Sequence, residues 1–212
     1  RPTSAPMSID DVVIKTAALF AVLVTVGGFA WRANSPSLAL VGFLGGFALA
    51  IVNSFSKKVR PPLVIAYAAA QGLALGTISR IYNDAYAGIV GQAVIGTLCA
   101  FLGVLVAYRS GKIRVTPKFT RIMMGALIGY VVFALFSMFV GFPGGGLGLL
   151  ISVGGVALAS MFIVMDFDQI EKAVAARVPQ EESWRCAFGL MVTLVWLYLE
   201  VLRLISILRS GD

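Results

Sequence analysis

One acidic residue lies inside the last apolar stretch of the chain, where a charge is costly. Residues 197–205 contain Glu200 and Arg203 but are otherwise almost entirely apolar. A charged side chain at membrane depth costs roughly 2.5–3.5 kcal/mol on insertion scales, so it marks a function or a specific partner. A second acidic cluster, residues 166–171 with Asp166 and Asp168, ends the preceding apolar segment. Acidic groups on two neighbouring spans indicate a site that responds to protons or cations.

Each of these acidic groups also has a simpler interpretation. Glu200 and Arg203 are three residues apart on one helical face, so they can form an intrahelical pair, which could also act as a latch. Asp168 stands where its span meets the cytoplasm and can be a solvated helix-end carboxylate, and the sequence does not separate it from Asp166. If Asp168 and Glu200 meet away from water, they share a proton and form a proton switch without histidine. Two carboxylates fall short of the six to eight oxygens that Ca²⁺ usually takes, so a transit site fits better than a storage site.

The composition places the chain in a membrane. Of its 212 residues, 59% are hydrophobic and only 13% are charged, whereas soluble domains carry about a quarter charged residues. The formal charge of +7 comes largely from short loops between apolar runs, which favours membrane orientation over nucleic-acid binding. The chain has no histidine, so His-ligated zinc and Ser-His or Cys-His catalysis are excluded. We therefore expect neither an enzyme nor a resident cofactor.

Seven segments are long and apolar enough to span the hydrocarbon core. They cover residues 12–31, 37–55, 62–82, 87–108, 119–140, 147–165 and 184–208. The sequence thus predicts an all-α membrane protein with seven transmembrane helices. Residues 1–11 are expected to be a disordered N-terminal remnant and residues 12–212 a single domain. Because Arg185, Glu200 and Arg203 lower the hydrophobicity of the last segment, a six-span alternative with a re-entrant last segment stays open.

Several polar residues and glycines inside the spans predict helix packing. Gln71 and Asn53 are expected to form interhelical hydrogen bonds, and Arg80 and Asp84, four residues apart, an interfacial ion pair. Three Gly-x-x-x-Gly spacings, 42–46, 72–76 and 125–129, allow close approach of helix backbones.

The motifs resemble the Bax inhibitor family, also called the transmembrane Bax inhibitor motif family, in its bacterial form. Residues 166–170, Asp-Phe-Asp-Gln-Ile, are similar to the family's Asp-Thr-Gln ending of the sixth span. Residues 197–204, Leu-Tyr-Leu-Glu-Val-Leu-Arg-Leu, are similar to its Leu-Tyr-Leu-Asp motif of the seventh. Residues 70–79 are similar to its Glu-Gly-x-x-Leu-Gly segment in the third span.

The resemblance implies a fold, an activity and a location. It implies a seven-helix bundle with the C-terminal helix at its centre, in the bacterial plasma membrane. It also implies a pH-sensitive Ca²⁺ leak governed by a carboxylate dyad, here Asp168 and Glu200, which would bind Ca²⁺ transiently.

Three departures from the family pattern concern the site. Glu200 stands where the family has Asp, which lengthens the side chain by one methylene, and Gln71 stands where it often has Glu. The second span has no arginine that could pair with the dyad. Only Arg203 or Arg80 could take that role.

Competing functions follow from the same residues. The first is a cation leak gated by protonation of the dyad, with Ca²⁺ and protons as its small partners. The second is a regulatory membrane protein that acts by binding a partner such as a membrane protease, without ion flux. A proton-coupled transporter is less favoured, because paired Gly/Pro-broken spans in matching halves are missing. An intramembrane hydrolase lacks a nucleophile–base pair.

The basic loops predict the orientation in the membrane. Basic residues gather between spans two and three, four and five, and six and seven, which places these loops and the N-terminus in the cytoplasm. In a background without Cys99 and Cys186, an impermeant maleimide should label a cysteine introduced at Gly144 in intact cells and leave one at Ala176 unlabelled. Labelling at Ala176 but not at Gly144 would reverse the orientation.

Overall fold

Prolines and polar capping residues determine where several helices begin. Pro36, Pro61 and Pro117 each stand at the first position of a helix, where the missing N–H removes no helical hydrogen bond. Ser8 and Thr116 accept backbone N–H groups at the starts of the first and fifth helices, as N-cap residues do. The helix starts are therefore set locally by the sequence.

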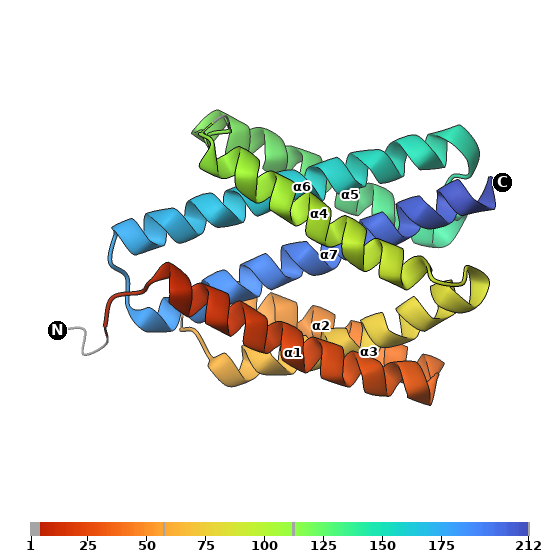
Figure 1. Cartoon of the computed structure of the whole chain (residues 1–212), viewed down its shortest axis with the longest axis horizontal. Helices are drawn as coiled ribbons and strands as arrows, with labels where there is room; N and C mark the ends of the chain where they lie inside the picture. Colours follow the sequence, from red (N-terminus) through yellow and green to blue (C-terminus); the bar gives the residue numbers. More distant parts are fainter. Residues whose placement is uncertain (1–4, 57, 112, 212) are drawn as a thin grey trace. The chain divides into compact units, whose positions relative to one another are not determined.

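The computed structural model describes residues 5–56, 58–111 and 113–211. Within these residues the chain forms seven α-helices and one short 3₁₀ helix, η1 (Figure 1). They are α1 (Ile9–Ala33), α2 (Pro36–Phe55), α3 (Pro61–Ala85), α4 (Ile89–Arg109), α5 (Pro117–Val140), α6 (Gly145–Ala175), η1 (Gln180–Glu182) and α7 (Ser183–Ser210). All seven α-helices contain a stretch long and apolar enough to cross a membrane. The predicted all-α fold with seven transmembrane helices is confirmed.

The sixth helix is longer than the predicted span. It continues for ten residues beyond Met165 and ends at Ala175, so the acidic cluster 166–171 lies on the helix instead of following it. The added residues include Gln169, Glu171 and Lys172, which are good helix formers, and no Gly or Pro interrupts them. The position of each carboxylate is therefore fixed by helix geometry.

The last helix is continuous. α7 contains 28 residues without a break, which corresponds to about 42 Å at about 1.5 Å per residue. The hydrocarbon core is about 30 Å thick, so α7 is long enough to cross it. The described residues of the last segment therefore form a continuous helix instead of a re-entrant one.

The helices group into two compact units, so the single domain expected for residues 12–212 is described in two parts. Unit 1 comprises Arg1–Ala85 and Gln169–Met191, and unit 2 comprises Tyr86–Asp168 and Val192–Asp212. Both units include part of α7, whose fully buried apolar residues are Ala187 and Met191 in unit 1 and Leu197 and Leu202 in unit 2. The last helix thus supplies core residues to each unit.

Glycines bring the first three helices of unit 1 into close contact. α3 packs against both α1 and α2. A Cβ atom at Gly76 would lie 2.8 Å from the Cα of Gly27, and one at Gly42 would lie 2.6 Å from the carbonyl oxygen of Ala70. Two of the predicted Gly-x-x-x-Gly spacings, 42–46 and 72–76, thus lie at helix contacts. Around positions 125 and 129 on α5 a Cβ atom would meet nothing within 4 Å.

The structure differs from the expectation of a disordered N-terminus for residues 5–11, while residues 1–4 lie outside the described residues. Ser8 and Asp11 form a capping box at the start of α1. The backbone N–H of Met7 donates to Val178 at 2.9 Å, and that of Gln180 donates to Ala5 at 2.9 Å. Met7 is buried. The N-terminal segment is therefore paired with the α6–α7 connection.

The α1–α3 contact gives a stability prediction. We expect Gly76→Ala to lower the melting temperature of the detergent-solubilised protein, because the new methyl group overlaps Gly27 and such overpacking typically costs about 1–3 kcal/mol. Gly28→Ala is the matched control, since a Cβ there would meet nothing within 4 Å. Equal melting temperatures for the two variants would contradict the close approach of α1 and α3.

Candidate functional site

Glu200 is a buried carboxylate in the middle of α7. Its relative exposure is 2%, and its near neighbours on the helix, Leu197 and Leu202, are fully buried. A charge in such surroundings is strongly disfavoured unless hydrogen bonds or an opposite charge compensate it. The contacts of Glu200 therefore determine what the site can do.

Three side chains donate to the Glu200 carboxylate. The phenol of Tyr130, from α5, and the indole of Trp196, one turn earlier on α7, both donate to Oε1, the latter at 3.1 Å. Arg203 forms an ion pair with the same carboxylate at 3.4 Å. Arg203 Nη1 also donates to Tyr130 Oη at 3.2 Å. We call Tyr130, Trp196, Glu200 and Arg203 the Glu200 cluster.

A glycine on α6 makes room for the cluster. A Cβ atom at Gly155 would lie 2.8 Å from Cδ of Glu200 and 3.1 Å from Oη of Tyr130. Any side chain at position 155 would therefore displace the carboxylate from its donors. α5, α6 and α7 together form the site within unit 2.

Aromatic rings surround the cluster. The Trp196 ring packs against those of Tyr130 and Phe162, with centroids 5.5 and 5.7 Å apart. The guanidinium of Arg203 lies 4.8 Å from the ring centroid of Phe142, in the turn between α5 and α6. The Arg203 side chain is 34% exposed, whereas that of Glu200 is 3% exposed. The cation is thus the accessible partner of the pair.

The structure does not bring Asp168 and Glu200 together. The Glu200 carboxylate contacts the Gly155 position of α6, and Asp168 lies thirteen residues further along that continuous helix. At a rise of about 1.5 Å per residue this separates the two levels by about 20 Å. The expected dyad is therefore not formed in this structure, and its approach in another conformation stays a prediction.

Asp166 is the second buried acidic group of unit 2. Its side chain is hydrogen-bonded to that of Thr193 on α7, while its Oδ2 is buried without a hydrogen-bond partner. An unsatisfied buried carboxylate oxygen is costly, so it is a place for a proton or a cation. Asp166 was predicted only as a supporting residue.

Gln71 and Arg80 lie in unit 1 and have other partners. Gln71 is hydrogen-bonded to Tyr67 of the same helix. Its Nε2 lies next to Gly46 on α2, where an added Cβ atom would be 3.0 Å away. Arg80 forms the predicted ion pair with Asp84, at 3.1 Å. Of the two arginines proposed as a latch, Arg203 is the one that contacts Glu200.

Sequence reasoning missed three features of the site. Trp196 is not among the site residues predicted from the sequence, although its position four residues before Glu200 places both on one helical face. Tyr130 was not singled out, and a hydroxyl within an apolar span was the signal that would have found it. Nothing in the sequence around Gly155 indicates which residue of α7 it meets.

The described residues contain no group of three or more acidic or cysteine side chains that could hold a metal ion. The geometry instead offers single acidic groups at different levels of unit 2.

The fold and the site together define a multi-pass α-helical membrane protein with a buried, arginine-paired carboxylate in its last span. The family model that matches the chain is described as Bax inhibitor 1 like, and the match covers residues 1–210. The chain belongs to this family. A comparison with curated proteins finds no match.

The contact at Gly155 can be tested by a pair of substitutions. We expect Gly155→Ala to lower the melting temperature clearly, because the methyl group displaces Glu200 and leaves a buried charge without its donors, a loss of about 1–3 kcal/mol. Gly154→Ala, one residue away, is the control, since nothing lies within 4 Å of a Cβ there. A Gly155→Ala protein as stable as Gly154→Ala would show that Glu200 does not need this space.

Proposed function

We propose that the protein is a pH-sensitive cation leak, with Ca²⁺ as the transported ion, and that the Glu200 cluster gates it. The observation that carries the proposal is a carboxylate of 3% exposure held by an arginine of 34% exposure inside a membrane span. Intramembrane charges are expensive and mark ion pathways or proton relays. The role is one of transport and involves no catalysis.

In the proposed mechanism the ion pair acts as a latch. While Arg203 neutralises Glu200, the carboxylate does not attract a cation. The Arg203 side chain is long and accessible, and its ion pair with Glu200 has a distance of 3.4 Å. Its release therefore exposes the negative carboxylate of Glu200 within unit 2. Protonation of Glu200 would abolish both the charge that holds Arg203 and the negative group that attracts a cation, so the proposed leak depends on pH.

Asp166 provides a second acidic position for the passing ion. It contacts Thr193 on α7, seven residues before Glu200, which is about 10 Å along the helix. Conduction requires several weak sites instead of one tight site. A buried oxygen of Asp166 without a partner and a latched Glu200 supply two such positions. Asp168 is two residues further along α6 and therefore lies on a different face of that helix from Asp166.

A regulatory role without ion flux is the second candidate. The carboxylate of Glu200 accepts from Tyr130, Trp196 and Arg203, which is how a purely structural buried charge would also be satisfied. In that case the cluster holds α5 and α7 together, and the protein acts by binding another membrane protein, such as a membrane protease.

We further propose that the protein lies in a bacterial plasma membrane with its N-terminus in the cytoplasm. The basic residues between α2 and α3, α4 and α5, and α6 and α7 support this orientation by the positive-inside rule. The Glu200 cluster then belongs to the half of α7 nearer the outer face.

The leak can be measured in proteoliposomes that contain a Ca²⁺-sensitive dye. We expect the flux of the unmodified protein to change with pH. The change falls between about pH 6 and pH 8 if Asp168 and Glu200 share a proton in another conformation, whereas a lone exposed carboxylate titrates near 4.3. Glu200→Gln should flatten this profile, because glutamine keeps the size of the side chain but does not titrate. Glu181→Gln, an exposed residue of η1, is the matched control. Arg203→Gln should raise the flux at every pH, since it removes the latch.

Two results would contradict the proposal. A Glu200→Gln protein that keeps the unmodified pH profile would show that Glu200 does not gate the flux. A flux no greater than that of protein-free liposomes at every pH would favour the partner-binding role. Asp168→Asn tests the dyad separately: if Asp168 and Glu200 titrate as a unit, the double variant adds little to either single one.

A further inference from the structure

A small pocket opens in unit 1 between the α2–α3 connection and the first turns of α7. It has a volume of about 10 Å³, which is room for one water-sized group. Its lining residues are Asn53, Lys58, Val59, Val64, Arg185 and Phe188. Two of the six are cationic and none is acidic.

The walls of the pocket are held in place by the fold. Asn53 donates to the carbonyls of Leu49 and Leu63 at 2.9 and 3.2 Å. Arg185 is bound to Glu182 at 2.8 Å and donates to the carbonyl of Ser56 at 3.1 Å. The polar groups that line the pocket are therefore preorganised for a ligand, which lowers the entropy lost on binding.

One cation of the pocket has no partner among the residues that the structure describes. Lys58 is exposed, and its ammonium forms no hydrogen bond or ion pair with the described residues. Arg185 forms an ion pair with Glu182, which offsets the charge of that arginine. Arg60, two residues further along the chain, adds a positive charge to the same α2–α3 connection.

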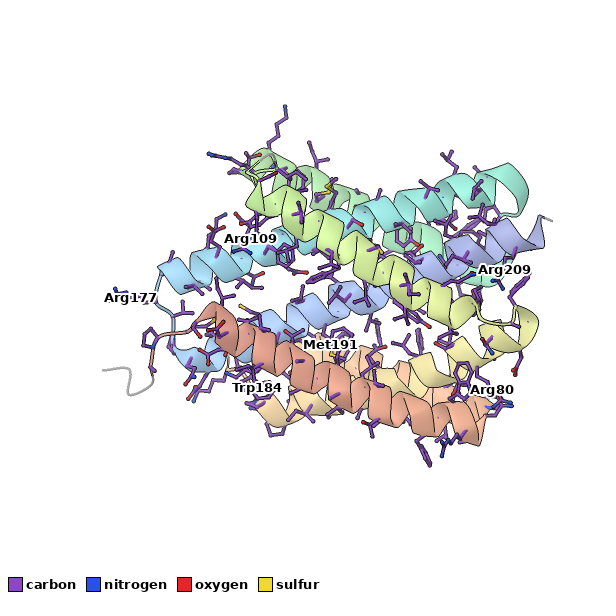
Figure 2. The ribbon with its side chains drawn as sticks, in the orientation of Figure 1. Arg80, Arg109, Arg177, Trp184, Met191 and Arg209 are labelled. Atoms are coloured by element: carbon purple, nitrogen blue, oxygen red, sulfur yellow. The ribbon has the colours of Figure 1, made fainter. Side chains whose placement is uncertain are left out.

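The neighbouring side chains place the pocket at a membrane–water interface. Trp184, beside Arg185, lies at the N-terminal end of α7 (Figure 2), and Lys15 of α1 lies 5.4 Å from its ring centroid. Tryptophan and lysine concentrate at the level of the lipid headgroups. In the proposed orientation this is the cytoplasmic leaflet, which contains anionic lipids.

We propose that this pocket binds the phosphate group of an anionic phospholipid. One phosphate oxygen enters the pocket, Arg185 forms its fixed cationic wall, and Lys58 closes over the group from the mouth. Basic pockets between transmembrane helices on the cytoplasmic side bind phospholipid headgroups in this way. The inference is independent of any ion leak and takes from the proposed function only the orientation.

The test is native mass spectrometry of the detergent-solubilised protein titrated with dioleoyl phosphatidylglycerol or dioleoyl phosphatidylcholine. We expect the protein to prefer the anionic lipid and Lys58→Gln to weaken its binding about five-fold, the effect of losing one cation near such a headgroup. Lys118→Gln removes the same charge from an exposed position on the same proposed membrane face and should change the affinity less than two-fold. Lys58→Arg should restore it.

The controls distinguish a specific lipid site from diffuse surface attraction and from a site for free phosphate. Circular dichroism and gel filtration establish that Lys58→Gln is folded, and Lys58→Arg gives a second readout in case it is not. Equal weakening by Lys58→Gln and Lys118→Gln would overturn the site in favour of diffuse surface attraction. Binding of inorganic phosphate to the unmodified protein, with no preference between the two lipids, would overturn the assignment to a lipid headgroup.

Discussion

A charge inside an apolar span must be neutralised, and much of unit 2 is arranged around that requirement. Glu200 is nearly inaccessible, so water does not stabilise it. Tyr130, Trp196 and Arg203 supply the donors that water would otherwise provide. α5 must therefore lie where its tyrosine reaches α7, and α6 must present a residue without a side chain at position 155. A single carboxylate thus constrains three helices.

In unit 1, glycines allow the helix backbones to lie in direct contact. Besides polar contacts such as the hydrogen bond from Asn53 to Leu63, its helices are held by direct contact between backbones. Gly27 on α1, Gly42 on α2 and Gly76 on α3 remove the side chains that would separate the helices. Packing of small residues is a main source of helix association in lipid, where no hydrophobic force acts between helices. The two units therefore illustrate the two ways in which membrane helices associate.

The sequence predicts the spans well and the long-range contacts of the site poorly. The apolar runs and the prolines locate the seven helices to within a few residues, except that α6 continues past Met165. The Glu200–Arg203 pair was foreseen as one alternative, because both residues lie on one helix at a fixed spacing. The partner from α5, Tyr130, depends on how two helices are rotated about their axes, and no local pattern encodes that rotation. The dyad of Asp168 and Glu200 was expected from resemblance, but the register of α6 against α7 places Gly155 next to Glu200.

The pairing of residues 5–7 with residues 178–180 also sets an order of events during synthesis. Met7 donates to Val178 and Gln180 donates to Ala5, so this closure joins segments separated by most of the chain. It becomes available only after six helices have been made and the connection to the seventh has left the ribosome. Contacts of such long sequence separation form late and slowly. Until then the buried side chain of Met7 lacks its cover, and a nascent chain that stalls before residue 180 keeps its N-terminal segment accessible to proteases and chaperones.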